Sequence, residues 1–397
     1  MHLVESFALN TGLKIGEPYI YEKFVPLPFE EKYISFQPFG KYDARKYDYW
    51  EEVLEILMPA LVKNNIRVIQ LGLPDEKLIY GCHNMRGKTD FNQAAYIIKN
   101  SLLHFGIDSF GVHFASGYDK KIVALYCNML PSNSGPYWSK KDDVILLEPE
   151  REGKNRCSYA PVEDPKTINT IKPEDIAKSV CKLLDISLDF PYRTIHIGQD
   201  FHVRKIELIP AMFIENWKQL GVDSVIVRMD QYFHEENLVH QLKRCKCSII
   251  TDKPINIKIL KTFKDKINEF VFFVDEETPP SYFQMLKATG ITYYLVSYLS
   301  EEELNKIKLD YIDVGGIIRK DKPKLEDIKE LEGKDLSKIY YKSSSFSIFQ
   351  DGIYCSNVFA NDNQSVKSVR GLSPAPIVDD PDFWDQSDSY LLLERTE

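Results

Sequence analysis

The stretch Phe105-Gly-Ile-Asp-Ser-Phe-Gly-Val-His-Phe-Ala-Ser-Gly117 decides the fold that we predict for this chain. Residues 102–107 form a short apolar run that predicts a buried strand, and a polar turn at Asp108 and Ser109 leads into a helix. A strand that feeds a helix through such a turn directs several backbone N–H groups, and the positive end of the helix dipole, to one point. Such a point binds phosphate well, although an ordinary strand-to-helix connection has the same pattern.

Short apolar runs alternate with amphipathic helical patterns on both sides of this stretch. Strands are predicted at residues 33–39, 67–73, 102–107, 121–127 and 144–148, and helices at residues 49–63, 90–100 and 173–184. Thr89 or Asp90 can cap the second of these helices, and Asp90 with Gln93 has the spacing of a capping box. The alternation indicates right-handed βαβ units and a parallel sheet, and therefore a Rossmann-like domain.

The second half of the chain repeats the alternation. Strands are predicted at residues 193–198, 224–228, 247–251, 270–275, 292–296 and 311–315, with helices between them. Gly221 and Gly290 are candidate helix C-caps, and Ser300 with Glu303 has capping-box spacing. This pattern predicts a second doubly wound α/β domain.

The last part of the chain has a different character. Residues 338–349 and 353–359, joined around Asp351-Gly352, predict a β-hairpin. The tail beyond it is polar but contains Phe383, Trp384 and Tyr390, so either it docks on a surface or it is a disordered terminus. The predicted organisation is a lead-in segment, two α/β domains, and a hairpin with a tail, over residues 1–29, 30–188, 189–335 and 336–397.

Composition narrows the class of protein. Among 397 residues, 59 are acidic and 50 are Lys or Arg, and a net charge of −9 makes nucleic acid an unlikely partner. No apolar run approaches the roughly 20 residues of a membrane-spanning helix, and the N-terminus lacks a signal-peptide pattern. We therefore expect a cytoplasmic protein without an integral membrane segment. The seven cysteines are scattered, and the pair Cys245 and Cys247 lacks the spacing of a zinc or thioredoxin motif.

An ordered set of motifs in the first half resembles the donor-binding domain of the ADP-heptose:lipopolysaccharide heptosyltransferases. The set comprises residues 34–38, the basic loop 41–46, the strand 68–72, the loop 85–93 that enters a helix, and residues 108–115. Residues 108–115 resemble the family's Asp-(Ser/Thr)-Gly-x-x-His phosphate turn, with Phe110 where the family usually has glycine. The resemblance implies a GT-B-like arrangement of two Rossmann-like domains.

The order of the domains departs from the family. There the acceptor domain precedes the donor domain, whereas here the donor-like domain lies near the N-terminus, after residues 2–18 that look like its usual lead-in. Residues 194–198 and Ile209-Pro210-Ala211 faintly resemble the family's opening strand, loop and helix. A circular permutation would explain both facts, and an unrelated α/β second domain is the other reading.

The resemblance implies a nucleotide-sugar donor site in the first domain. Loss of the nucleoside diphosphate builds negative charge, which backbone N–H groups, hydroxyls and cations can stabilise without a metal. The predicted donor-binding residues are Lys41, Arg45, Lys46, Arg86, Gly87, Lys88, Thr89, Asp108, Ser109, Phe110, Gly111, Val112 and His113. These residues could instead have ordinary structural roles. The basic side chains could be solvated, the histidine could be structural, and Thr89 and Asp90 could cap their helix.

An inverting transfer also needs a general base, usually a carboxylate. Under the permutation it lies in the loop after residues 192–198, where Asp200 is our first candidate and Glu207 the second. The family's catalytic aspartate aligns near Arg204, so no acidic residue matches that position. Either Asp200 has taken the role, or the activity is altered or lost.

The sequence thus predicts a metal-independent, cofactor-free glycosyltransferase that moves a sugar from a nucleotide-diphosphate sugar to a glycan or other hydroxyl acceptor. His196, His202, His234 and His240 lack the spacing of a helical zinc pair, and no P-loop or complete dinucleotide fingerprint is present. One alternative is a non-catalytic protein that binds nucleotide sugar, glycan or a protein partner. A second is a sugar epimerase on a similar scaffold.

Overall fold

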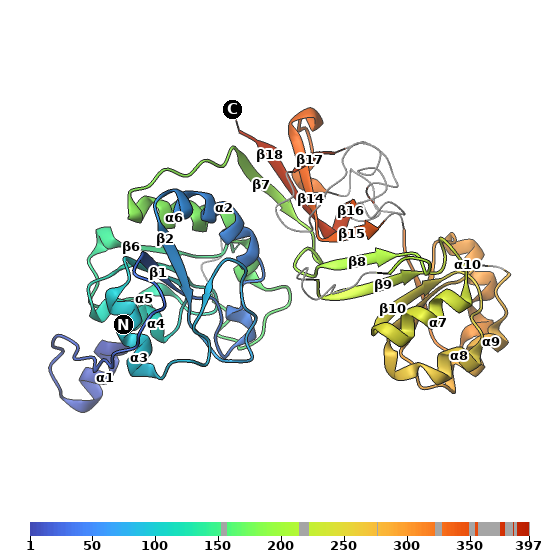
Figure 1. Cartoon of the computed structure of the whole chain (residues 1–397), viewed down its shortest axis with the longest axis horizontal. Helices are drawn as coiled ribbons and strands as arrows, with labels where there is room; N and C mark the ends of the chain where they lie inside the picture. Colours follow the sequence, from blue (N-terminus) through green and yellow to red (C-terminus); the bar gives the residue numbers. More distant parts are fainter. Residues whose placement is uncertain are drawn as a thin grey trace. The chain divides into compact units, whose positions relative to one another are not determined.

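The computed structural model divides into two compact units, Met1–Pro191 and Tyr192–Glu397, and each is described by itself. The residues that the structure describes are 1–151, 157–213, 222–275, 277–321, 328–348, 354–355, 374–377, 384 and 387–396. Parallel β-sheets with helices between their strands form both units (Figure 1), which confirms the α/β class. The circular permutation stays a prediction.

The first unit is built on a six-stranded parallel sheet with the strand order β3-β2-β1-β4-β5-β6. Its strands are β1 (Lys32–Gln37), β2 (Ile66–Gln70), β3 (His83–Asn84), β4 (Leu103–Ile107), β5 (Lys121–Leu125) and β6 (Val144–Leu147). All five predicted strands are confirmed, and β3 was not predicted. The chain order reverses between the neighbours β1 and β4, which defines the switch point of a doubly wound sheet.

Helices cover both faces of this sheet (Figure 1). They are α1 (Leu3–Thr11), α2 (Trp50–Lys63), α3 (Phe91–Asn100), α4 (Phe110–Gly117), α5 (Pro131–Ser134) and α6 (Pro173–Leu184), with 3-10 turns η1 (Asp43–Arg45), η2 (Lys141–Asp143) and η3 (Thr167–Thr170). On one face α2 contacts α6, and the ring of Trp50 lies 4.9 Å from that of Phe36 on β1. On the other face Ile97 of α3 and Val112 of α4 share a buried cluster with Ile122 of β5.

Local signals in the sequence set two of these helix starts. The Asp90 carboxylate accepts the Gln93 N–H at 2.8 Å and the Gln93 side chain accepts the Asp90 N–H at 3.0 Å, so the predicted capping box is confirmed. Helix α1 was not predicted, because residues 1–29 were expected to form only a lead-in segment. Its cap is the ring of His2, whose Nδ1 accepts the Val4 N–H at 3.2 Å.

The main sheet of the second unit has the order β13-β12-β11-β10-β9-β8-β15-β16. Its strands are β8 (Lys205–Leu208), β9 (Ser224–Arg228), β10 (Cys247–Thr251), β11 (Ile267–Phe273), β12 (Tyr293–Ser297), β13 (Ile317–Arg319), β15 (Ser345–Ile348) and β16 (Tyr354–Cys355). From β8 to β13 the strands are parallel and follow the chain order without a reversal. The chain then returns and places β15 parallel to β8 on its other side, so the sheet has, between β8 and β15, the reversal of strand order that the doubly wound prediction requires.

Right-handed crossovers that always step in one direction place every crossover helix on the same face. The helices are α7 (Glu235–Arg244), α8 (Ile257–Thr262), α9 (Pro280–Lys287) and α10 (Glu301–Ile307). Side chains of α7, α8 and α9 share one buried cluster with alternate residues of the strands, such as Val227, Ile249 and Phe272. The intervening residues Ile226 and Ile250 point to the other face and are only half-buried.

One predicted strand of this unit is wrong. Residues 311–315 do not pair, because Tyr311 ends a 3-10 turn, η6 (Lys308–Tyr311), and its buried hydroxyl donates to the Thr278 carbonyl at 2.7 Å. The edge strand β13 begins at Ile317, two residues after Gly315. The capping box at Ser300 and Glu303 is confirmed at the start of α10.

A separate four-stranded sheet has the order β17-β14-β18-β7, with β7 (Tyr192–Ile197), β14 (Ile339–Ser343), β17 (Ala375–Pro376) and β18 (Tyr390–Arg395). The predicted strand 193–198 exists as β7, but it pairs antiparallel with β18 and does not open the parallel sheet. The predicted strand 338–349 divides at Ser344 between β14 and β15. The hairpin turn at Asp351-Gly352, Phe383 and Gly221 lie outside the described residues.

The tail contributes to this sheet and its core. Trp384 and Tyr390 are 1% and 0% exposed, so the described part of the tail packs against the second unit. Within the described ranges, no helix has the length and apolar character needed to cross a membrane.

Candidate functional site

The switch point of the first unit brings together several of the residues predicted from the sequence. The neighbours β1 and β4 end at Gln37 and Ile107, and Asp108 and Ser109 follow at the same edge of the sheet. Ligands of doubly wound folds bind at this edge, beside the reversal of strand order. Gly106 permits the close approach of the two strands, because it has φ +152° and a Cβ there would lie 2.1 Å from the Gln37 carbonyl oxygen.

The side chain of Gln37 occupies the turn that was predicted to bind phosphate. Its Nε2 donates to Ser109 Oγ at 2.9 Å, and its Oε1 accepts the Gly111 N–H at 3.1 Å. The Val112 N–H donates to the Ser109 carbonyl at 3.1 Å. Gln37 therefore fills hydrogen-bonding positions at the start of α4 that a phosphate oxygen would otherwise take.

Asp108 is held from the side by Arg45 of η1. The Arg45 guanidinium lies 3.2 Å from Asp108 Oδ2 and also donates to the Asp108 carbonyl at 2.9 Å and to Asn128 Oδ1 at 3.0 Å. Burial raises the pKa of Asp108 above its ordinary value, against the charges of Arg45 and His113, which lower it. Arg45 thus fixes the turn and compensates a buried carboxylate.

His113 lies on the first turn of α4, with Nε2 3.9 Å from Asp108 Oδ1 and 44% of its side chain exposed. Burial lowers the pKa of His113 below its ordinary value, although the carboxylate of Asp108 raises it. The neutral ring therefore predominates at neutral pH. It can donate or accept a hydrogen bond at the mouth of the turn.

A buried histidine, His104, packs directly against the start of α4. His104 on β4 is fully buried, and its Nδ1 lies 3.0 Å from Ser35 Oγ. Its Nε2 has no hydrogen-bond partner in the described part of the chain, and a Cβ on Gly111 would lie 2.5 Å from it. Burial lowers the pKa of His104 to about 3, so this ring stays neutral. Because residue 111 is a glycine, the first turn of α4 can pack directly against the His104 ring.

Phe110 stands where the related family usually has glycine, and its side chain packs against neighbouring helices rather than in the turn. Its ring makes edge contacts with Phe91 at 5.1 Å and Phe114 at 5.5 Å, between α3 and α4. The backbone of residue 110 thus enters the helix as a glycine would.

The remaining predicted donor-binding residues fall into two loops. Lys41 is exposed, with its ammonium 5.8 Å from the Tyr42 ring, and Lys46 lies 3.5 Å from Asp43. Arg86 donates to Asn84 Oδ1 at 3.1 Å and to the Glu76 carbonyl, so it braces its own loop.

The three residues after Arg86 complete that loop and lead into α3. Gly87 has φ +63° and donates its N–H to the Gly72 carbonyl at 2.8 Å. Lys88 is exposed, and Thr89 precedes the Asp90 cap.

The two predicted general bases lie in the second unit. Asp200 is 51% exposed, with Oδ2 3.0 Å from Lys205 Nζ. Glu207 was expected in a loop but lies on β8, with Oε2 2.7 Å from Arg228 Nη1. Arg228 also pairs with Asp230 at 2.7 Å, so Glu207 belongs to a largely buried ion cluster.

Sequence reasoning missed Gln37, Asn128 and His104. Each acts through a partner at least 69 residues away along the chain, and no local spacing marks such pairs. Among the residues that the structure describes, no group of three or more His, Cys, Asp or Glu side chains could hold a metal ion.

Residues 10–163 match the sequence model of glycosyltransferase family 9 (heptosyltransferase). The resemblance predicted over the first half of the chain is thereby confirmed, and the match supports the glycosyltransferase prediction. No curated protein sequence matches the chain.

Solved structures with partial similarity include ADP-heptose LPS heptosyltransferase II of E. coli, with 17% identity over 45% of this chain and 50% of that chain, and a TM-score of 0.31. A family 9 glycosyl transferase from Veillonella parvula has 19% identity over 39% and 46%, with a TM-score of 0.33. The glycosyltransferase TibC of enterotoxigenic E. coli has 13% identity over 44% and 52%, with a TM-score of 0.35. The chain spans about half the length of these structures.

Proposed function

We propose that this chain is a metal-independent, GT-B-like glycosyltransferase that moves a sugar from a nucleotide-diphosphate sugar to a hydroxyl acceptor such as a glycan, and that it acts in the cytoplasm. One observation carries the proposal. The segment that matches family 9, residues 10–163, contains the β1–β4 switch point, and a Ser109–Gly111 turn opens a helix there. That is where a doubly wound sheet binds a diphosphate.

The proposed chemistry at this turn is stabilisation of the leaving diphosphate. Ser109 Oγ, the Gly111 N–H and the dipole of α4 favour negative charge, and Lys41 is an exposed cation in the loop after β1. Gln37 must leave Ser109 and Gly111 before phosphate oxygens take its place. Arg45 has a positioning role in this scheme, because its guanidinium is engaged with Asp108 and Asn128.

The two candidate general bases differ in how firmly each carboxylate is held. Glu207 is held by Arg228 within a sheet. Asp200 is half exposed, so water or a substrate hydroxyl can replace Lys205 as the partner of its carboxylate. We therefore keep Asp200 as the candidate base, to be tested as Asp200→Asn.

A non-catalytic protein that binds nucleotide sugar is the second candidate function. It is favoured by the basic residue Arg204 near the family's aspartate position and by the ion cluster that engages Glu207. Donor turnover separates the two, since a binder would bind the donor without releasing nucleoside diphosphate. An epimerase would change the donor sugar with no acceptor present.

Calorimetric titration of the full chain with ADP, UDP, GDP and CDP tests the proposed site. One of them should bind, and Gln37→Ala should tighten that binding about tenfold, because it frees the Ser109 hydroxyl and the Gly111 N–H. Ser109→Ala should weaken it about tenfold, and His113→Ala should also weaken it.

Gln70→Ala is the matched control for this titration. Gln70 ends β2 and also binds two backbone groups, the Lys77 carbonyl at 2.8 Å and the Ile79 N–H at 2.8 Å, but both partners belong to the loop after β2 and not to the start of α4. Its loss should leave the affinity unchanged. Nucleotide affinities that are equal in Gln37→Ala, Ser109→Ala and the unaltered chain would contradict the site.

A further inference from the structure

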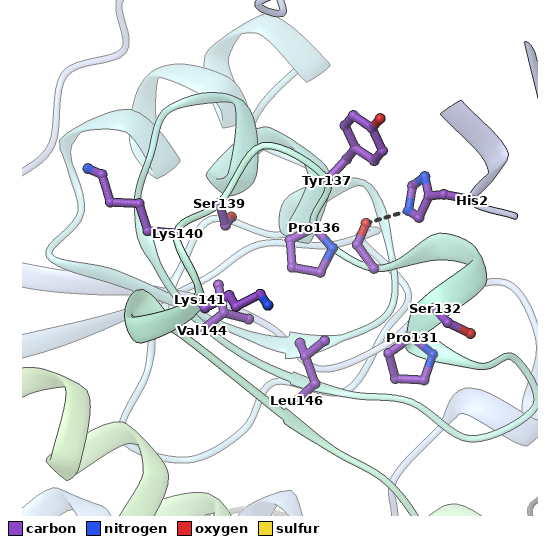
Figure 2. A pocket seen from close by; sticks show the side chains of 11 residues that line it. His2, Pro131, Ser132, Pro136, Tyr137, Ser139, Lys140, Lys141, Val144 and Leu146 are labelled. Carbon is purple, nitrogen blue, oxygen red and sulfur yellow. Dashed lines mark hydrogen bonds between the residues drawn. The ribbon is translucent and has the colours of Figure 1, made fainter. Parts of the chain in front are cut away.

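A cavity lies in the first unit, beside the edge strand β6. It has a volume of about 450 Å³ and is bordered by the segment from α5 to η2, by β6 and by His2 (Figure 2). None of its lining residues belongs to the turn at Ser109. A cavity of this size suits a small molecule rather than a macromolecule.

His2 closes one wall of the cavity. Its Nδ1 accepts the Val4 N–H, so the ring proton is on Nε2, which donates to the Gly135 carbonyl at 2.9 Å. The ring centre lies 4.8 Å from that of Tyr137. Both nitrogens are used, so His2 supplies a flat surface and an anchor for α1.

Most of the wall is apolar and flat. Pro131, Pro136 and Tyr137 border the cavity from the loop, and Val144 and Leu146 border it from β6. Figure 2 shows these side chains around one opening. Rings of proline and tyrosine pack well against the C–H face of another ring.

The polar groups of the cavity favour an anion. Ser139 Oγ is buried and has no hydrogen-bond partner in the described part of the chain, so it can serve a ligand. Lys140 extends away from the other labelled side chains in Figure 2 and pairs with Asp119, whereas Lys141 is the other lysine that lines the cavity. The lining residues, all of which the structure describes, include two lysines and no acidic side chain.

We propose that this cavity binds a small anionic sugar, a pyranose that carries a carboxylate or a phosphate group. The ring packs on Tyr137 and the prolines, a sugar hydroxyl pairs with Ser139, and the anionic group pairs with Lys141. The inference rests on the proposed function for the choice of a sugar among ring-shaped anions. The cavity adjoins the switch point through α5, because Ser134 Oγ lies 3.4 Å from Asp108 Oδ2.

Titration calorimetry of the full chain with glucose 1-phosphate and with glucuronate tests this inference and separates the two kinds of anion. At least one should bind saturably. Neutral glucose, which lacks the anionic group, and inorganic phosphate, which lacks the sugar ring, should each bind at least about tenfold more weakly. Lys141→Met should weaken binding about tenfold, and Ser139→Ala several-fold.

Lys140→Met is the matched control, because it removes the neighbouring charge that is already paired with Asp119 and should change the affinity less than about twofold. Circular dichroism of each variant checks the fold. Equal binding to Lys141→Met, Ser139→Ala and the unaltered chain, or binding abolished by Ser109→Ala, would overturn the assignment to this cavity. Nucleoside diphosphate binding without any sugar-anion binding would also overturn it and leave the proposed function standing.

Discussion

The two parallel sheets of this chain come from similar sequence patterns and differ in topology. In the first unit the strand order reverses between β1 and β4, and β4 leads through a short turn into the helix α4, whereas in the second unit it reverses between β8 and β15, and β15 is reached directly from β14 of another sheet. A reversal opens a crevice at the carboxyl edge of the strands, and in the first unit the start of α4 directs backbone N–H groups to that edge. The comparison teaches that alternation of strands and helices predicts a parallel sheet but not a ligand site.

The two units also differ in the partners and surroundings of their buried arginines. In the first unit Arg45 pairs with Asp108 at the switch point, beside the half-exposed His113. In the second unit Arg228, at the end of β9, pairs with two carboxylates, Glu207 on β8 and Asp230 in the turn after β9. We regard the first arrangement as part of a site and the second as structural.

The largest expected effect is at the contact between β1 and β4. Gly106→Ala should destabilise the first unit by about 4 kcal/mol, because a Cβ would clash with the Gln37 carbonyl and the residue has φ +152°. Gly290→Ala in the second unit should cost about 1 kcal/mol, since it has φ +75° but nothing within 4 Å. Urea denaturation measures both, and similar losses would contradict a tight switch point.

Removal of the buried arginines should have the next largest effect. Arg45→Met and Arg228→Met should each cost about 3 kcal/mol at pH 7, with the larger loss at Arg228 because two carboxylates lose their partner. Urea denaturation at pH 7 compares them, and a loss at either site below about 1 kcal/mol would contradict a buried charge pair.

The loss in Arg45→Met should also depend on pH. The folded pKa of Asp108 is already raised above its unfolded value, and loss of Arg45 raises it further. A raised carboxyl pKa destabilises the fold as pH rises from the unfolded value near 3.8 through the folded value, so the loss should shrink toward pH 4. Denaturation at pH 4.5 and pH 7 checks this sign, and a loss that grows toward acid pH would contradict it.

The smallest expected effect concerns the two capping boxes. Asp90→Ala in the first unit and Ser300→Ala in the second should each cost about 1 kcal/mol, because each side chain accepts an N–H at a helix start. Urea denaturation should give similar values for both units. A difference of more than about 1 kcal/mol would mean that the units differ in local structure as well as in topology.

Local features of the fold were predictable from the sequence, and pairings between distant segments were not. The turn at Asp108-Ser109 and the cap at Asp90 follow from neighbouring residues, and both occur as predicted. The strand at residues 193–198 was predicted correctly as a strand, but its sheet depends on Tyr390–Arg395, almost two hundred residues later. Strand order in the second unit is non-local in the same way.

The same distinction between local features and contacts of distant segments applies to the candidate site. Ser109, Gly111 and His113 were found because they are close in sequence, whereas the side chain that occupies their turn, Gln37, comes from another strand. Arg45 was predicted as a phosphate ligand from its charge, but its orientation toward Asp108 depends on a contact across 63 residues. The sequence shows which polar and charged residues are present, but only the fold shows which of them are already hydrogen-bonded to one another.

The central claim, that the switch point of the first unit is the nucleotide site, is tested most directly by hydrogen exchange of the full chain with and without the tightest-binding nucleoside diphosphate. We predict slower exchange at residues 37–45 and 103–117, and no change at residues 205–319. Protection confined to the second unit, or spread equally over both sheets, would contradict the claim that the β1–β4 switch point and the start of α4 form the site.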